Sequence, residues 1–364
     1  MIRFTKARHK LVRPVQPIGK KSVLQRLNDY LDQNEHEVVQ ILYRNIEELD
    51  TVYTYKELRE AYFAGQIPPE DFQKWQTAYA HIVDVAFRDR WERAAEQAAN
   101  EIKRQYPDFI YEPSVSSALE FIRGHGAELV TVLAQDQIDA LNAIIGHISG
   151  YTGITPDEAS LIMRPLIGLN RPQAFANARY LTRVKRKYMS DHPNTSLETA
   201  DKVAHQAAAR YGAKQHRYRA MMIARTELAF GYNAGHYGAT LDAQKQGYIG
   251  ECKKVWVTAY DERVCEVCST LDEDERRMDE IFPTGRLLPP AHPNCRCAVA
   301  YEEIPSSDIP KIVLNPDYSD DTMINKPIVN ETSEMDNSEI VITNTPVKPV
   351  KVTYGCKDVT KNWL

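Results

Sequence analysis

Four of the chain's six cysteines and one of its histidines fall within one loop-rich stretch, CEVCSTLDEDERRMDEIFPTGRLLPPAHPNCRC, at residues 265–297. A Cys-x-x-Cys turn supplies two metal ligands from one bend, and structural zinc takes four such ligands in a tetrahedron. Five candidate ligands therefore compete for four places. They are Cys265, Cys268, His292, Cys295 and Cys297.

The segment between the ligands is polar and includes an acidic run at residues 272–275. It cannot build a hydrophobic core, and a bound zinc ion could supply on the order of 10 kcal/mol of folding free energy instead. Pro289, Pro290 and Pro293 stiffen the approach to the second half of the cluster, which lowers the entropy lost when the ligands converge. We therefore predict a structural zinc site.

Three other interpretations of the cluster stay open. Free cysteines could cluster by chance, and a disulfide could form if the protein ends in an oxidising setting. A catalytic zinc would keep three protein ligands and a water. No metalloprotease or deaminase motif precedes the cluster, which weakens the catalytic interpretation.

The composition limits the remaining classes of protein. The chain has 364 residues, of which 43% are hydrophobic, enough apolar content for one large core or two smaller ones. Its net charge is −5. Because the whole chain is mildly acidic, any contact with nucleic acid must be local. No apolar run approaches the roughly 20 residues of a membrane span, so no membrane partner is expected. Six cysteines are too few for a disulfide scaffold and favour synthesis in a reducing cytoplasm.

Apolar residues at three- and four-residue steps predict a helical region at residues 22–110. Gly65 and the Pro68-Pro69 pair interrupt the pattern before a long helix at about residues 70–104. Aromatic residues at helical spacing in that helix are predicted core residues. They are Phe72, Trp75, Tyr79, Phe87 and Trp91.

Residues 111–250 are predicted to form a central domain of shorter helices. Two of these carry N-cap signals, Thr155 with Glu158 and Thr195 with Glu198. The last helix has small residues at Gly231, Gly235 and Ala239, every four positions, with Gly238 close by. Since each internal glycine costs about 1 kcal/mol of helix stability relative to alanine, close packing against another backbone is the expected compensation.

The hydrophobic period changes from helical to alternating at Lys253. The segment KKVWVTAY places Val255 and Val257 on one side and Trp256 on the other, which predicts a strand, and CAVAYEEI predicts a second. We expect residues 251–304 to form a small β module with the zinc site, and residues 305–364 to form an extended or disordered tail. The predicted fold is mainly α: a multi-helix N-terminal and central region, a small C-terminal β zinc-knuckle module and an extended tail.

Two basic segments stand out from the acidic chain. Residues 1–21 hold seven lysines and arginines and no acid, and RYLTRVKRKY makes a positive patch from Arg179 to Lys187. Either the N-terminal arm or the basic helix could contact DNA or an acidic partner. A solubilising chain end and a solvated helix face are the alternatives.

A second candidate site lies in ARTELAFGYN, where Arg225 and Glu227 resemble the catalytic pair of a transferase. Residues two apart on a helix point about 200° apart, so these two side chains cannot face one substrate. Thr226 and Asn233, seven apart, share a face. We interpret all four as polar struts between this helix and its neighbours.

The ordered motifs IARTELAFGYNAGHYGA, DERVCEVC and PPAHPNCRC, followed by a strand, resemble the tailed-phage minor head proteins, the Mu F-like head morphogenesis family. The resemblance covers about residues 115–303. It departs from the family after Asp272, where Glu273 replaces the usual glycine.

The resemblance implies a non-enzymatic protein of the virion, made in the cytoplasm of the host bacterium. It implies association with the portal protein at the portal vertex during prohead assembly, with the scaffold or major capsid protein as further possible partners and DNA as a possible contact. Two other functions stay open. They are an enzyme, either a zinc-dependent hydrolase or an ADP-ribosyltransferase-like protein using Glu227, and a stand-alone DNA-binding zinc module.

Overall fold

The computed structural model describes residues 20–151, 153–259 and 261–305. The chain divides into two units, Met1–Glu303 and Ile304–Leu364, and the described residues belong almost entirely to the first. The predicted basic arm and tail therefore lie outside the described residues, except for residues 20, 21 and 305. The boundaries predicted at residues 110 and 250 stay predictions.

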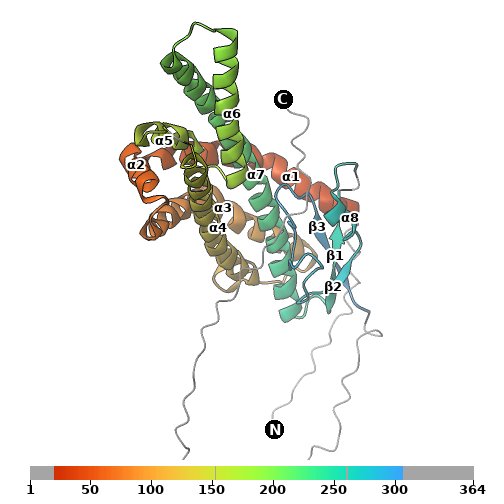
Figure 1. Ribbon diagram of the computed structural model, residues 1–364. Coiled ribbons are helices and arrows are strands. Elements are labelled where there is room, and N and C mark those ends of the chain that lie inside the picture. The colour runs from red at the N-terminus through yellow and green to blue at the C-terminus, as the bar shows by residue number, and fades with distance from the viewer. Residues whose placement is uncertain (1–19, 152, 260, 306–364) are drawn as a thin grey trace, which may run out of the picture. The chain divides into compact units, whose positions relative to one another are not determined.

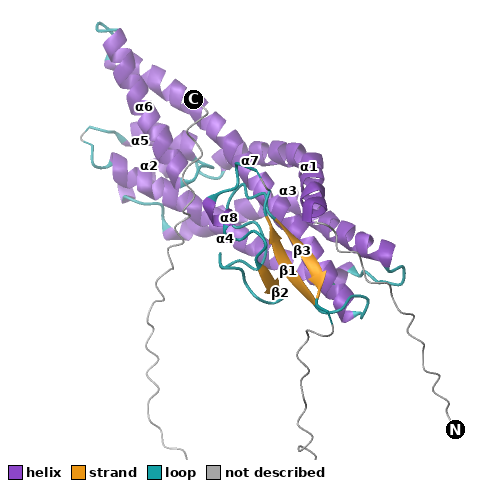
Figure 2. Ribbon diagram, turned by 90° about the vertical axis from the view of Figure 1, so that its right-hand side faces the viewer, coloured by secondary structure: helices purple, strands orange, loops and turns teal. Residues whose placement is uncertain are grey.

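The described part of the chain is mainly helical with one small sheet, as the sequence predicts (Figures 1 and 2). None of its helices is both long enough and apolar enough to cross a membrane. The longer helices are α1 (Lys20–Glu48), α2 (Tyr55–Ala64), α3 (Phe72–Gln105), α4 (Ser117–Ile148), α5 (Pro156–Met163), α6 (Arg171–Asp191) and α7 (Leu197–Lys245). The elements of the C-terminal module are β1 (Cys252–Val257), the short helix α8 (Glu266–Ser269), β2 (Glu275–Arg277) and β3 (Ala298–Glu303).

The N-terminal helices follow the predicted pattern. Gly65 ends α2 in the left-handed conformation, with φ of 77°, which glycine adopts without steric cost. In α3, Trp75, Tyr79, Phe87 and Trp91 are buried, and Phe72 is partly buried against the same core. Helix α3 packs on α1, α4 and α7, so its aromatic face reaches the centre of the helical region.

Three of the central helices are shorter than α3, which has 34 residues, but α7 has 49 and contradicts the prediction of shorter central helices. Helix α7 continues through its internal glycines, because tertiary packing outweighs the helix propensity of single residues. An added Cβ at Gly235 would lie 2.8 Å from the Ala94 carbonyl oxygen of α3. The predicted close packing of the glycine stripe is therefore present, against α3 at Gly231 and Gly235 and against Ala118 of α4 at Gly238.

One of the two predicted N-caps lies one residue away from the predicted position. Thr155 caps α5 as expected, accepting a hydrogen bond from the Glu158 backbone N–H at 3.2 Å. Helix α7 is capped by Ser196, whose Oγ accepts from the Thr199 N–H at 3.1 Å. Thr195 instead donates its own N–H to the His192 carbonyl at 3.0 Å, in the turn that joins α6 to α7.

The two predicted strands pair antiparallel as β1 and β3, with Trp256 opposite Val299. A third strand, β2, pairs with the other edge of β1, so the sheet order is β2-β1-β3. Strand β2 comes from the polar insert and was not predicted, because it has no apolar alternation. Val255, Trp256 and Val257 are all buried, so both faces of β1 are covered.

Candidate metal centre

The first two candidate ligands lie on one turn of backbone. Cys265 is the N-cap of α8 and Cys268 lies inside it. The Cys268 N–H points at the Cys265 sulfur, with an N···S distance of 3.4 Å. A backbone N–H aimed at a sulfur favours the thiolate, which is the form that binds metal.

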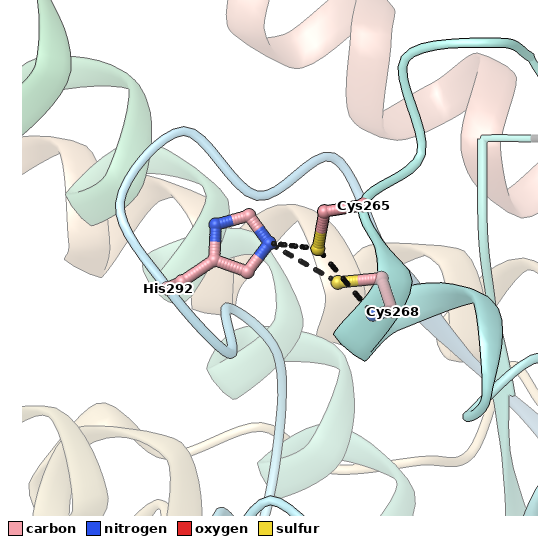
Figure 3. A group of neighbouring side chains, drawn as sticks. All are labelled: Cys265, Cys268 and His292. Atoms are coloured by element: carbon pink, nitrogen blue, oxygen red, sulfur yellow. Dashed lines mark hydrogen bonds between the residues drawn. The ribbon is translucent and has the colours of Figure 1, made fainter. Parts of the chain in front are cut away.

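The third candidate ligand reaches this turn from a loop 24 residues further along the chain. The Nε2 atom of His292 lies 3.2 Å from the sulfur atoms of both Cys265 and Cys268 (Figure 3). The other ring nitrogen, Nδ1, lies 2.8 Å from the Pro293 carbonyl oxygen. A carbonyl can only accept, so Nδ1 donates to it, and Nε2 is the ring nitrogen that faces the two sulfurs. This arrangement is common at histidine ligands of metals.

Cys295 and Cys297 complete the cluster from the inner side, where they are 1% and 3% exposed. The Cys268 and Cys295 sulfurs are 3.7 Å apart, far more than the roughly 2.05 Å of a disulfide bond. The five side chains form two overlapping groups, and each group has its ligand atoms within 4.8 Å of one another. One group contains Cys265, Cys268 and His292, the other Cys268, Cys295 and Cys297, so Cys268 belongs to both.

These distances fit the edges of a tetrahedral zinc site. With Zn–S near 2.3 Å and Zn–N near 2.0 Å, two sulfurs should lie about 3.8 Å apart and a sulfur and a nitrogen about 3.5 Å apart. The Cys268–Cys295 distance of 3.7 Å and the two Cys–His distances of 3.2 Å are close to these values. Cys268 lies at such a separation from both His292 and Cys295, one ligand from each group.

A hydrogen bond couples the buried thiols of Cys268 and Cys295. The hydrogen bond with Cys295 raises the pKa of Cys268, and the same contact holds the pKa of Cys295 well below its usual range. The pair therefore favours a thiolate at Cys295 stabilised by a neighbouring S–H donor. A metal ion would take the place of the shared protons, because thiolate is the ligand form.

Helix α7 holds the second half of the cluster in position. The Thr226 hydroxyl oxygen accepts a hydrogen bond from the Asn294 N–H at 3.0 Å, at a residue with a left-handed backbone, φ 61°. The Asn233 side-chain oxygen accepts from the Val299 N–H at 3.1 Å, two residues after Cys297. Thus two of the predicted polar struts, Thr226 and Asn233, contact the loop on either side of the last two cysteines.

The other two predicted struts point to different neighbours. Arg225 is paired with Glu35 of α1 at 3.8 Å. The Glu227 carboxylate lies 2.6 Å from Nε2 of His125 on α4, and its backbone carbonyl accepts from the Trp91 indole N–H at 2.8 Å. Arg225 and Glu227 therefore do not face one substrate, and Glu227 lies in the helical core with its carboxylate already paired.

Sequence reasoning missed several residues that hold the module together. Lys254 is fully buried in β1 and donates to the carbonyls of Met278 and Leu287 at 3.1 and 3.0 Å. Its burial lowers the pKa of the ammonium group to about 8. The alternation of a strand predicts which face of β1 Lys254 occupies. It does not predict the two loop carbonyls that accept its hydrogen bonds, because these come from residues distant in the chain.

A bidentate ion pair also ties the two halves of the cluster. Arg296, between the last two cysteines, donates to both carboxylate oxygens of Asp261 at 2.5 and 2.6 Å. The guanidinium holds the pKa of Asp261 well below its usual range.

Two cavities of about 370 and 250 Å³ lie elsewhere, and neither is lined by a candidate ligand or by Glu227.

Fold and cluster together define a class: a mainly helical protein with a cysteine- and histidine-rich β module mounted on one long helix. Residues 195–300 match the model of the family described as Phage Mu protein F like protein, so this part of the chain is similar to that family. The match contains α7, β1, β2, the start of β3 and all five candidate ligands, and the resemblance in the sequence is confirmed over these residues. Searches of curated proteins and of solved structures gave no match.

Proposed function

We propose that this Mu F-like protein is a non-enzymatic component of the phage head that joins the portal vertex during prohead assembly and remains in the virion. The observation that carries the proposal is the extent of the matched region. It begins at the start of α7 and ends inside β3, so it covers one continuous unit of helix and ligand-bearing module. A docking part needs a rigid surface, since ordering a flexible surface on binding costs affinity.

The metal in this proposal is structural zinc. Cys265, Cys268, His292 and Cys295 would hold the ion, and Cys297 would lie beside it as a neighbouring thiol. Four protein ligands leave no position for a reacting water, which is the arrangement of structural sites. When bound, zinc would supply the folding free energy that the polar insert lacks.

The non-enzymatic part of the proposal rests on Glu227 and the ligand count. A catalytic carboxylate needs access to a substrate, whereas the Glu227 side chain is 7% exposed and paired with His125. The buried pairing supports a structural role for Glu227 in joining α7 to α4. An enzyme using this residue should lose activity in Glu227→Gln while retaining assembly.

Portal association can be tested with the full chain and the portal protein of its phage. The two proteins are co-expressed and sedimented together at low salt with zinc present. We expect co-sedimentation with about one zinc per chain by elemental analysis. Cys265→Ser combined with Cys268→Ser should abolish both, whereas Cys252→Ser, which removes a buried thiol outside the cluster, should leave both intact.

The two measurements separate the parts of the proposal. Zinc-loaded wild-type protein that does not sediment with the portal would contradict portal association and leave the metal site standing. A double cysteine variant with unchanged zinc content would contradict the metal site. The scaffold and major capsid proteins are tested as partners in the same gradients, because the portal vertex adjoins both.

A further inference from the structure

The α6–α7 hairpin, residues 171–219, carries a charge opposite to that of the whole chain. It holds eleven lysines and arginines against three acidic residues, a net +8 in a chain of net −5. Two of the three acids already have lysine partners inside the hairpin, since Lys187 pairs with Asp191 and Lys185 with Asp201. Most of the positive charge is therefore available to a partner.

The distal part of this hairpin contributes little to the hydrophobic core, with Leu181 partly buried against it. No residue from 179 to 199 is buried, although both segments belong to helices whose other ends are packed. Both views show the ends of α6 and α7 extending beyond the other helices (Figures 1 and 2). A pair of helices that buries so little surface of its own is typical of an interaction surface.

Basic side chains follow the outer side of α6. Arg179, Arg183 and Arg186 are spaced i, i+4, i+7 and are all exposed, so they form one stripe about 10 Å long. The side of α6 that faces α7 is marked by two contacts. Asn177 donates to the Ala208 carbonyl at 3.1 Å, and the Tyr180 and Tyr211 rings lie 4.7 Å apart. The arginine stripe is turned roughly 120° from this side, and its central member, Arg183, lies over the Tyr180 ring at 5.3 Å.

A second set of basic residues follows the outer side of α7. Lys202, Arg210 and Lys214 are exposed and lie at multiples of four residues. They point away from Ala208 and Gln215, which face α6. Within the described residues, none of these three and none of the three α6 arginines forms an ion pair, so six cations lie on two outward faces of one hairpin.

We infer that the α6–α7 hairpin binds double-stranded DNA on both faces and bridges two duplexes. Unpaired arginines are suited to phosphates, because the guanidinium fork donates two hydrogen bonds to one phosphate group. A single acidic protein surface would use one face and leave the other unsatisfied, whereas closely spaced duplexes present phosphates on both sides. The contact is with the backbone and is independent of base sequence.

This inference goes beyond the assembly role, and its test needs no portal protein. One biotinylated duplex is held on beads, full-length protein is added, and capture of a second, fluorescent duplex of unrelated sequence is measured. The α6 variant combines Arg179→Gln, Arg183→Gln and Arg186→Gln. The α7 variant combines Lys202→Gln, Arg210→Gln and Lys214→Gln. The matched control combines Arg44→Gln, Lys103→Gln and Arg123→Gln, which removes the same charge from exposed residues elsewhere.

Wild-type protein and the control should capture the second duplex, and either face variant should lower capture at least tenfold. Binding of the first duplex should persist in each face variant, with a salt slope smaller by about 2 to 3. Unchanged melting temperature and zinc content would show that each variant is folded.

Three results would overturn the inference. Face variants that behave like the control would place the DNA contact elsewhere. Capture that survives loss of either face would assign the second contact to another copy of the chain. Equal competition by poly-glutamate and by duplex DNA of the same total charge would make the ligand an acidic protein surface.

Discussion

The two halves of α7 differ in how much of their surface the protein covers. Along residues 200–212 only every fourth residue is buried, namely Ala200, Ala204, Ala208 and Gly212. Along residues 227–240 every residue except His236 is buried. One continuous helix therefore packs along a single narrow face in the exposed hairpin at its N-terminal end. At its C-terminal end it is packed on nearly all sides, by the helical core and the ligand module. Substitutions should cost stability at the second end and binding at the first.

The largest expected effect is at the shared ligand. Cys268→Ser removes a member of both overlapping groups, so it should release the metal and unfold residues 252–303 before the helices. The loss could approach the roughly 10 kcal/mol that structural zinc contributes. Elemental analysis and hydrogen exchange measure the two effects, with Cys252→Ser as the matched control. A module equally protected from exchange after complete removal of zinc would contradict the metal's structural role.

The buried lysine of β1 should give the module a characteristic pH dependence. The pKa of Lys254 is about 8 in the folded protein, below its ordinary value of 10.5. The unfolded chain therefore binds more protons between these pH values, and the free energy of unfolding should rise with pH across that window. The gain relative to Lys254→Met should be at most about 3 kcal/mol. Urea titrations of both proteins from pH 7.5 to about 10.5 measure the difference, and parallel curves would contradict the assignment.

Close packing on the covered half of α7 predicts an effect of intermediate size. Gly235→Ala places a methyl group against the Ala94 backbone of α3 and should lower the free energy of unfolding by about 1–3 kcal/mol. Gly124→Ala is the matched control, because nothing lies within 4 Å of its Cβ. It should instead stabilise α4 by about 0.5–1 kcal/mol. Denaturant unfolding measures the change in the free energy of unfolding for both variants. Equal changes would show that close packing does not determine the effect of an added methyl group.

The smallest expected effect is at the exposed start of α7. Ser196→Ala removes the N-cap hydrogen bond and should weaken the first turn by about 1 kcal/mol. Because Ala200 is the only buried residue of this turn, hydrogen exchange at residues 197–200 should speed up while the melting temperature changes little. Thr195→Ala should have no such effect. An effect of equal size would show that Thr195, and not Ser196, is the N-cap of α7.

Local patterns in the sequence predicted most elements but few of their lengths. The breaks at Gly65 and Pro68 were predicted correctly because they act through the backbone of their own residues. The 49-residue length of α7 was not, because the N-terminal half of this helix packs against α6, a contact that no pattern within α7 specifies. Strand β2 was missed for the same reason, since its pairing with β1 and not its own composition makes it a strand.

The sequence by itself determined the helical character of the protein, the presence of one strand pair and the identity of five candidate ligands. Propensity, hydrophobic period and cysteine spacing are properties of short segments, so they can be read without knowing the fold. Only the tertiary structure decided which ligands lie within reach of one another, that Glu227 is paired with His125, and that Lys254 is an internal cation. It also decided that the basic residues of α6 and α7 lie on two opposed faces. These depend on contacts between segments distant in the chain, which no local pattern specifies.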